Sequence, residues 1–307
     1  MDIVFLIGGL ILLIFSGELL VKGAVGTAKR FNVSTLVIGL TIVSFGTSAP
    51  ELLVSLRAAF KHSGDIAIGA VIGSNVSNLG LVLGLSAMVY PIKISSDTIK
   101  IDWRMMMLAT VWFILSILDN KLSFFEGLTY VILLVLFNYW IINRSRKLER
   151  EKISERSKES SVLKHLGLIV AGSVGLTYGA DLFLDGAVGI AEYFGLSHRV
   201  IGITVVAVGT SLPELITAMV AAFRKETDIS IGNLIGSNIF NILAILGITS
   251  LVKTIDVNEK VLEFDVYWLF GISLLLLPLM YVRKKVGRIS GMLLLLVYLS
   301  YISLVIL

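Results

Sequence analysis

The sequence contains one polar stretch twice, as Gly46-Thr47-Ser48-Ala49-Pro50-Glu51 and as Gly209-Thr210-Ser211-Leu212-Pro213-Glu214. Each copy lies inside an apolar segment. Hydroxyl groups, a helix-breaking proline and a carboxylate are all costly in hydrocarbon, so they are retained there for a function. The repetition of the same costly set at two matching positions predicts a binding site, and its oxygen groups favour a cation.

The composition is that of a polytopic membrane protein. Of 307 residues, 56% are hydrophobic and 16% are charged, and the mean hydropathy is +0.91. A soluble domain could not bury this much apolar surface. The net charge is +4, but the basic residues lie in short loops between apolar segments. They are therefore interpreted as topology signals, with no nucleic-acid partner. The lack of cysteine excludes thiolate chemistry and sulfur-ligated metals.

Ten segments are long and apolar enough to cross about 30 Å of hydrocarbon. The sequence thus predicts an all-α, multi-pass protein of the cell membrane with ten transmembrane helices, surrounded by the lipid bilayer. The segments lie near residues 3–21, 35–60, 66–90, 103–118, 122–142, 163–184, 200–223, 229–252, 266–282 and 289–307. The fourth and the ninth are short for a span.

The loop between the fifth and sixth segments, within residues 144–162, is basic. Under the positive-inside rule this loop is cytoplasmic, and with ten spans both termini are then extracellular. Counting outward also places Arg224-Lys225 inside and the acidic residues from Asp256 to Asp265 outside. Arg57 and Lys61 fall on the outer side, against the rule.

An internal repeat organises the whole chain. Residues 30–84 align without a gap with residues 193–247 at a constant offset of 163, with 27 identities over 55 positions. Each half has five spans, an odd number, so the halves are predicted to be inverted relative to each other. The predicted division is residues 1–143, a cytoplasmic loop over 144–162, and residues 163–307. Inverted repeats place a shared site near the midplane, between the halves.

The polar stretch predicts broken helices at that site. Pro50 lacks an amide hydrogen, so carbonyl groups near Gly46 lose helical partners and become available to a cation. The first copy presents Ser44, Thr47, Ser48 and Glu51 on one helical face, and the second presents Ala207, Thr210, Ser211 and Glu214. At Ala207 only the backbone oxygen can contribute.

A second pair of motifs follows one span later. Gly73-Ser74-Asn75-Val76-Ser77-Asn78 and Gly236-Ser237-Asn238-Ile239-Phe240-Asn241 correspond at the same offset. Ser74 and Asn78 are four residues apart, as are Ser237 and Asn241, so each pair shares a helical face. These oxygens are expected to meet the segments that contain Glu51 and Glu214, whereas the glycines are interpreted as helix packing.

Other charged residues have simpler interpretations. Glu18 and Lys22 suit a local ion pair one helical turn apart. Asp181 and Asp185 lie near one end of a single helix, whereas an intramembrane aspartyl enzyme needs two aspartates that face each other. The chain is therefore not expected to be an enzyme.

The two motif pairs resemble the alpha repeats of the cation/calcium exchanger superfamily, in particular the prokaryotic sodium/calcium exchangers. The resemblance implies that Glu51 and Glu214 hold calcium beside Thr47 and Thr210. It implies sodium ligands at Ser48, Ser211, Ser74 and Ser237, backbone ligands at Ser44 and Ala207, and a polar pair at Asn78 and Asn241. Archaeal and potassium-dependent members have an aspartate where this chain has Asn241.

The implied function is sodium/calcium antiport by alternating access, with calcium and sodium as transported ions and no cofactor. Calcium takes six to eight oxygen ligands, which the motifs can supply. The family's usual exchange of three sodium ions for one calcium would be electrogenic, and the neutral Asn241 predicts independence from potassium. A proton/calcium antiporter is the nearest alternative, and a passive cation channel is less favoured because inverted repeats indicate alternating access. The sequence makes no prediction of oligomeric state.

Overall fold

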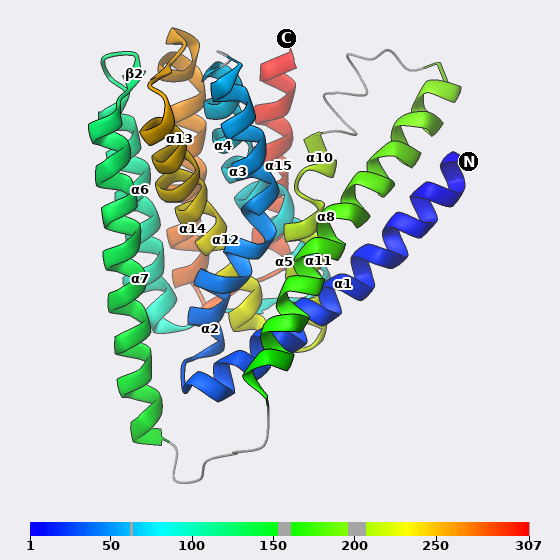
Figure 1. Ribbon diagram of the computed structural model, residues 1–307, viewed down its shortest axis with the longest axis vertical. Coiled ribbons are helices and arrows are strands. Elements are labelled where there is room, and N and C mark those ends of the chain that lie inside the picture. Colours follow the sequence, from blue (N-terminus) through cyan, green and yellow to red (C-terminus); the bar gives the residue numbers. More distant parts are fainter. Residues whose placement is uncertain (62–63, 153–160, 196–206, 307) are drawn as a thin grey trace.

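The computed structural model describes residues 1–61, 64–152, 161–195 and 207–306, and these residues are almost all helical (Figure 1). The predicted all-α membrane fold is confirmed. In the first half the α-helices are α1 Asp2–Phe31, α2 Thr35–Ile38, α3 Ser44–Phe60, α4 Gly64–Ser77, α5 Leu83–Val89, α6 Trp103–Ser116 and α7 Phe124–Lys152. In the second half they are α8 Val162–Tyr193, α10 Ala207–Gly209, α11 Leu212–Phe223, α12 Thr227–Phe240, α13 Gly247–Val252, α14 Val266–Tyr281 and α15 Arg288–Ile306.

Short π-helical segments interrupt several of these helices. They are η1 Gly39–Val43, η2 Asn78–Val82, η3 Thr98–Asp102, η5 Asn241–Leu246 and η6 Val261–Asp265. Segments η3 and η6 join directly to α6 and α14, which lengthens the two helices that the sequence suggested were short. Segments η2 and η5 begin at Asn78 and Asn241, two predicted site residues. Wide π turns often mark functional sites because they redirect side chains and backbone carbonyls.

The secondary structure itself repeats at the offset found in the sequence. Moving α4, Gly64–Ser77, forward by 163 residues gives residues 227–240, which are the bounds of α12. The same shift carries η3, Thr98–Asp102, onto η6, Val261–Asp265. The repeated sequence therefore specifies a repeated succession of elements, down to the unusual π-helical turns.

Two small antiparallel ladders connect the halves. Strand β1, Ile92–Lys93, pairs with β4, Lys285–Val286, and strand β2, Lys121–Leu122, pairs with β3, Ile255–Asp256. The predicted topology places both members of each pair on the same side of the membrane. In Figure 1 both termini lie near the end that carries β2, and the facing ends of α7 and α8 lie at the opposite end.

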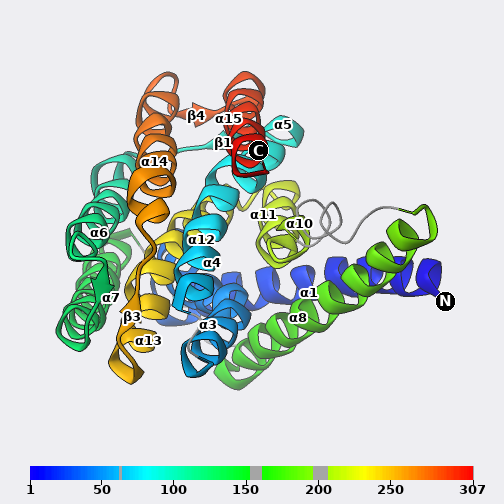
Figure 2. The ribbon, with the colours of Figure 1, turned by 90° about the horizontal axis from the view of Figure 1, so that it is seen from above.

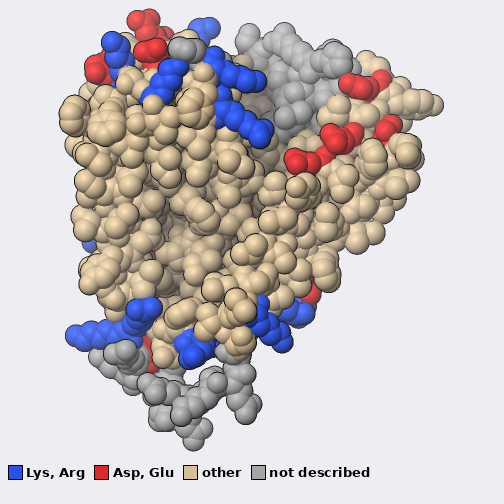
Figure 3. All heavy atoms as spheres, viewed as in Figure 1, with Lys and Arg blue, Asp and Glu red and all other residues tan. Residues whose placement is uncertain are grey.

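Eight helices among the described residues are long and apolar enough to cross a membrane, and α6 and α11 are shorter apolar helices. The predicted seventh span begins in residues 200–206, which lie outside the described residues, so ten spans remain a prediction. Charged side chains gather at the two ends of the molecule and leave a broad uncharged belt between them (Figure 3). That distribution fits a bilayer around the middle of the protein.

Helices α4 and α12 lie at the centre, and α1 and α8 form a long arm along one flank (Figures 1 and 2). In the span Thr227–Val252, 83% of the most apolar window is buried inside the protein, against 28% for Asp2–Phe31. Polar residues in α12 and α4 are therefore shielded from lipid. A membrane protein can retain such residues only where other helices satisfy or use them.

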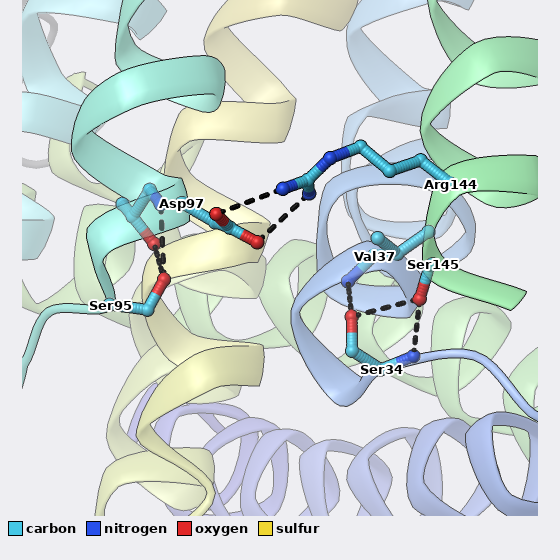
Figure 4. A network of polar contacts seen from close by, with 7 residues as sticks. Ser34, Val37, Ser95, Asp97, Arg144 and Ser145 are labelled. Atoms are coloured by element: carbon cyan, nitrogen blue, oxygen red, sulfur yellow. Dashed lines mark hydrogen bonds and ion pairs between the residues drawn. The ribbon is translucent and has the colours of Figure 1, made fainter. Parts of the chain in front are cut away.

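A polar network ties α7 to the end of the protein opposite the termini (Figure 4). Arg144 donates two hydrogen bonds to Asp97, at 2.9 and 3.1 Å, from α7 to the residue before η3. Ser145 Oγ accepts the backbone N–H of Ser34 at 2.8 Å, and Ser34 is the N-cap of α2. These contacts fix the start of the α2–η1–α3 span, which leads to the repeated polar stretch.

Candidate cation site

The two polar stretches meet in the centre of the molecule, as the inverted repeat predicts. Ser48 of α3 donates a hydrogen bond to Glu214 Oε1 of α11 at 3.3 Å, which joins the two copies directly. Thr47 Oγ1 donates to Asn233 Oδ1 of α12 at 3.2 Å and lies 3.5 Å from Ser237 Oγ. Side chains from both halves thus surround one point.

The two carboxylates are buried with few partners. Glu214 is 0% exposed, and its Oε2 atom has no hydrogen-bond partner among the described residues. Both carboxylate oxygens of Glu51 are also buried and without a partner in the described part of the chain. A buried carboxylate without donors is strongly destabilised unless a cation or a proton accompanies it. Each of the two glutamates therefore requires a compensating cation or proton.

Amide oxygens extend the site. The Asn241 amide donates to Ser74 Oγ at 3.2 Å and to Asn75 Oδ1 at 2.9 Å, which directs its own Oδ1 elsewhere. That oxygen is buried without a partner in the described residues, and so are both polar atoms of Asn78. Unpartnered amide oxygens of this kind are typical hard ligands for an alkali or alkaline-earth cation.

The remaining predicted residues take different positions. Ser44 Oγ donates to the Leu40 carbonyl at 2.8 Å, within its own helix. Ser211 Oγ lies 2.8 Å from Ser77 Oγ, across the halves. Thr210 is exposed and lines a cavity. Ala207 begins α10, and its side chain lies outside the described part of the structure.

The predicted helix breaks are seen in one half only. In the second half α10 ends at Gly209 and α11 begins at Leu212, so Thr210 and Ser211 form a turn, and Pro213 occupies the first turn of α11. In the first half α3 runs through Pro50 without interruption. A proline removes one amide, but the helical hydrogen bonds on either side persist when packing holds the helix. The equivalent stretches therefore differ in conformation.

A cavity of about 340 Å³ reaches the site from one side. Its lining includes Glu51, Ser74 and Thr210, together with Tyr298 and Ile302 of α15. Helix α15 ends close to the C-terminus, so this mouth lies on the side of the molecule where both termini lie (Figure 1). Glu51 thus belongs to the wall of this cavity, although its carboxylate oxygens are themselves buried.

The opposite side of the site is closed by backbone contact. A Cβ atom at Gly236 would lie 2.6 Å from the Leu40 carbonyl oxygen, and one at Gly232 would lie 2.6 Å from that of Leu36. Only glycine allows α12 to approach the α2–η1 segment this closely. At the equivalent Gly69 and Gly73 of α4, no described residue lies within 4 Å of the Cβ position. The segment equivalent to α2–η1, residues 198–206, lies outside the described residues.

Comparison with known proteins decides the family. A profile of the family described as "Sodium/calcium exchanger protein" matches residues 1–143 and 164–307. This chain belongs to that family. The resemblance predicted from the two motif pairs is therefore confirmed.

Relatives of this exchanger match it along nearly its whole length. The putative antiporter CaxA of Alkalimonas amylolytica is 37% identical over 308 residues, which cover 97% of this chain and 96% of CaxA. The sodium/calcium exchanger MaX1 of Methanosarcina acetivorans is 32% identical over 346 residues, covering 98% and 97%. A solved structure of the sodium-calcium exchanger NCX_Mj superposes with a TM-score of 0.85 at 35% identity, covering 99% of this chain and 98% of that one.

Sequence reasoning missed two polar residues that contact the predicted ligands, Asn233 and Ser77. The repeat aligns Asn233 with Ala70 and Ser77 with Phe240, so a search for residues shared by both halves passes over them. Helical spacing could have revealed Asn233, because Asn233, Ser237 and Asn241 follow one another at intervals of four. Their positions make the polar lining of the exchanger site unequal in its two halves.

Proposed function

We propose that this protein exchanges sodium for calcium across the membrane by alternating access at the site between Glu51 and Glu214. The proposal rests on two buried carboxylates, one from each half. Three of their four oxygen atoms lack hydrogen-bond partners among the described residues. Their combined charge of −2 matches one calcium ion. The names of the relatives MaX1 and NCX_Mj, both sodium/calcium exchangers, support the same ions.

The ligand assignment follows the motif pairs. Glu51 and Glu214 hold calcium, and the hydroxyl and amide oxygens around them complete a shell of six to eight oxygens. Sodium, which also prefers oxygen, uses the same carboxylates once calcium leaves. The full proposed set is Glu51, Glu214, Thr47, Thr210, Ser48, Ser211, Ser74, Ser237, Asn78 and Asn241, with backbone oxygens at Ser44 and Ala207.

The charge of the site predicts an electrogenic cycle. The site with its two carboxylates is neutral when it binds one calcium ion. It carries one net positive charge when it binds three sodium ions. A tenfold sodium gradient counted three times supplies about 4 kcal/mol. An inside-negative potential of 100 mV adds about 2.3 kcal/mol for the moved charge. Both terms favour calcium export from a cell.

Alternating access is supported by the unequal conformations of the two repeats, since α3 is continuous whereas Thr210 and Ser211 interrupt the corresponding span. The cavity lined by Glu51 lies on the side of the termini, and on the opposite side Gly232 and Gly236 pack closely against the α2–η1 segment. Because the halves are repeats, exchanging their conformations produces a state with the opposite mouth open. With both termini outside the cell, the present state is open to the exterior.

The direct test is calcium uptake into proteoliposomes loaded with sodium at constant pH. We expect an outward sodium gradient to drive uptake and a proton gradient without sodium to drive none. Uptake that follows the proton gradient and ignores sodium would instead identify a proton/calcium antiporter. Calcium current that persists without any counter-ion gradient would identify a channel.

A further inference from the structure

The helical hairpin of α11 and α12 contains three buried polar side chains outside the proposed ligand set. Thr217, Ser230 and Asn233 are each 0% exposed. The two hydroxyl groups and the Nδ2 group of Asn233 have no hydrogen-bond partner among the described residues. Buried polar groups without partners are costly and rare in folded proteins, so each requires an explanation, such as water or an ion that binds there.

These groups form a file that leads away from the cation site. On α11, Thr217 lies three residues after Glu214 and therefore on the same face of the helix. On α12, Asn233 lies four residues before Ser237, and Ser230 lies three residues before Asn233. A short turn joins the end of α11 to the start of α12. Both rows therefore run from the site toward this turn.

The repeat shows what such positions line. At the offset of 163, Val54 matches Thr217 and Ala70 matches Asn233. Val54 and Ala70 both line the cavity on the side of the termini. If the halves exchange conformations, Thr217 and Asn233 line the corresponding path on the side of the α11–α12 turn.

The repeat also shows that the fold does not need polar groups at these positions. In the first half the three matching residues are Val54, Ala67 and Ala70, which are all apolar, although 27 of 55 aligned positions are identical. The first half thus builds the same helices without them. Because polar side chains are costly inside a membrane protein, their presence in one half alone indicates a function on that side.

Helix α1 packs against α11 beside this file. A Cβ atom at Gly17 would lie 3.1 Å from Ile216. At the end of α11, Arg224 forms an ion pair with Glu18 of α1, whereas the sequence suggested Lys22 as the partner of Glu18. These contacts and the full burial of the three polar side chains show that helices enclose the file in the present conformation.

We propose that Thr217, Ser230 and Asn233 line the ion path between Glu214 and the α11–α12 turn and bind water there. Hydroxyl groups donate and accept hydrogen bonds, and the Asn233 amide donates them, so the file suits water molecules. This water hydrates sodium or calcium as the ion leaves the carboxylates. The inference rests on the alternating access proposed above.

The first test uses the natural lack of cysteine. Single Thr217→Cys and Ser230→Cys variants are treated with an impermeant cationic methanethiosulfonate reagent, in membrane vesicles of each orientation with sodium on both sides. Lys225→Cys, in the exposed turn, identifies the vesicles in which this side faces the reagent. In those vesicles both cysteines should react about tenfold faster than Thr249→Cys, because the path opens during the cycle. Thr249 of α13 is equally buried and unpartnered among the described residues.

The second test removes the hydroxyl groups and nearly preserves the side-chain volumes. Thr217→Val with Ser230→Ala introduces the residues that the first half has at these positions. Sodium-driven calcium uptake should slow about fivefold, because the ion crosses the file with less water. Thr217→Ser, which keeps the hydroxyl, and the matched Thr249→Val should both transport at the wild-type rate. The thermal midpoint of the double variant should not fall, since no hydrogen bond is lost.

Several results would overturn the proposal. They are labelling of Thr217→Cys and Ser230→Cys no faster than that of Thr249→Cys, labelling from the side opposite to Lys225→Cys, and a wild-type transport rate in the double variant. A slower rate with a lower thermal midpoint would indicate a purely structural role instead. Labelling does not depend on which ions are exchanged, so its failure is distinct from a failure of sodium-driven calcium uptake.

Discussion

At the scale of single residues, the proposed site depends on two buried carboxylates, Glu51 and Glu214, whose oxygens have few partners among the described residues. Glu51→Gln and Glu214→Gln should each abolish sodium-driven calcium uptake, because one remaining carboxylate cannot balance a divalent ion away from water. The exposed Glu263→Gln should transport normally and serves as the matched control. Proteoliposome flux of monodisperse, folded variants measures this. Uptake near the wild-type rate in either glutamine variant would remove that residue from the site.

Asn241 provides a prediction about ion selectivity. Its amide offers an oxygen dipole without a third negative charge, so the site lacks the charge to bind potassium together with calcium. In sodium-loaded vesicles at clamped voltage, calcium uptake should be equal in external potassium and in choline. Stimulation of severalfold by potassium, or uptake of a rubidium tracer, would contradict this assignment of Asn241.

Much of the site follows from residue chemistry, and the rest depends on packing. The paired Gly-Thr-Ser-x-Pro-Glu stretches located both carboxylates, because such groups are too costly in a bilayer to be accidental. The partner of Ser48 and the role of Asn233 could not be predicted in the same way. The first depends on how closely α11 approaches α3 and the second on how closely α12 approaches α3, and the sequence of a single helix determines neither distance.

At the scale of elements, Gly236 and Gly73 form a matched pair. A methyl group at Gly236 would meet the Leu40 backbone in the present state, whereas one at Gly73 would have no neighbour within 4 Å among the described residues. If the halves exchange conformations, Gly73 meets the same restriction in the other state. Overpacking of this kind costs about 1–3 kcal/mol.

Gly236→Ala should therefore open the closed mouth, and Gly73→Ala should keep it closed. A cysteine at Thr217, which is buried in α11, can report this opening through its labelling rate with a methanethiosulfonate reagent. The rate should rise at least fivefold in the first variant and fall at least fivefold in the second, and exchange should slow in both. A Gly73→Ala protein that transports at the wild-type rate would show that α4 never packs as α12 does here.

The elements also show where a repeated sequence stops predicting structure. Identical motifs imply equal helices, yet α3 continues through Pro50 while Thr210 and Ser211 interrupt the corresponding span. A single conformation of an inverted repeat must be asymmetric if one mouth is open. The same sequence must be compatible with both states. It therefore cannot indicate which half contains the interrupted helix in either state.

At the scale of the whole molecule, the basic loop within residues 144–162 predicts the orientation. Cysteines introduced at positions 155 and 284 should be protected from an impermeant thiol reagent on intact cells, whereas a cysteine at position 307 should react. Position 284 precedes β4, whose pairing with β1 already groups two loops that the topology places on one side. Labelling at position 155 without labelling at position 307 would reverse the orientation.

The central claim is that one cation site lies between Glu51 and Glu214. It is tested most directly by anomalous diffraction from crystals grown without sodium and soaked with strontium as a substitute for calcium. We expect a strong peak within coordinating distance of both carboxylates, about 2.3–2.6 Å for the calcium that strontium replaces, and its loss when sodium is added in excess. Strontium bound elsewhere, or unaffected by sodium, would contradict it.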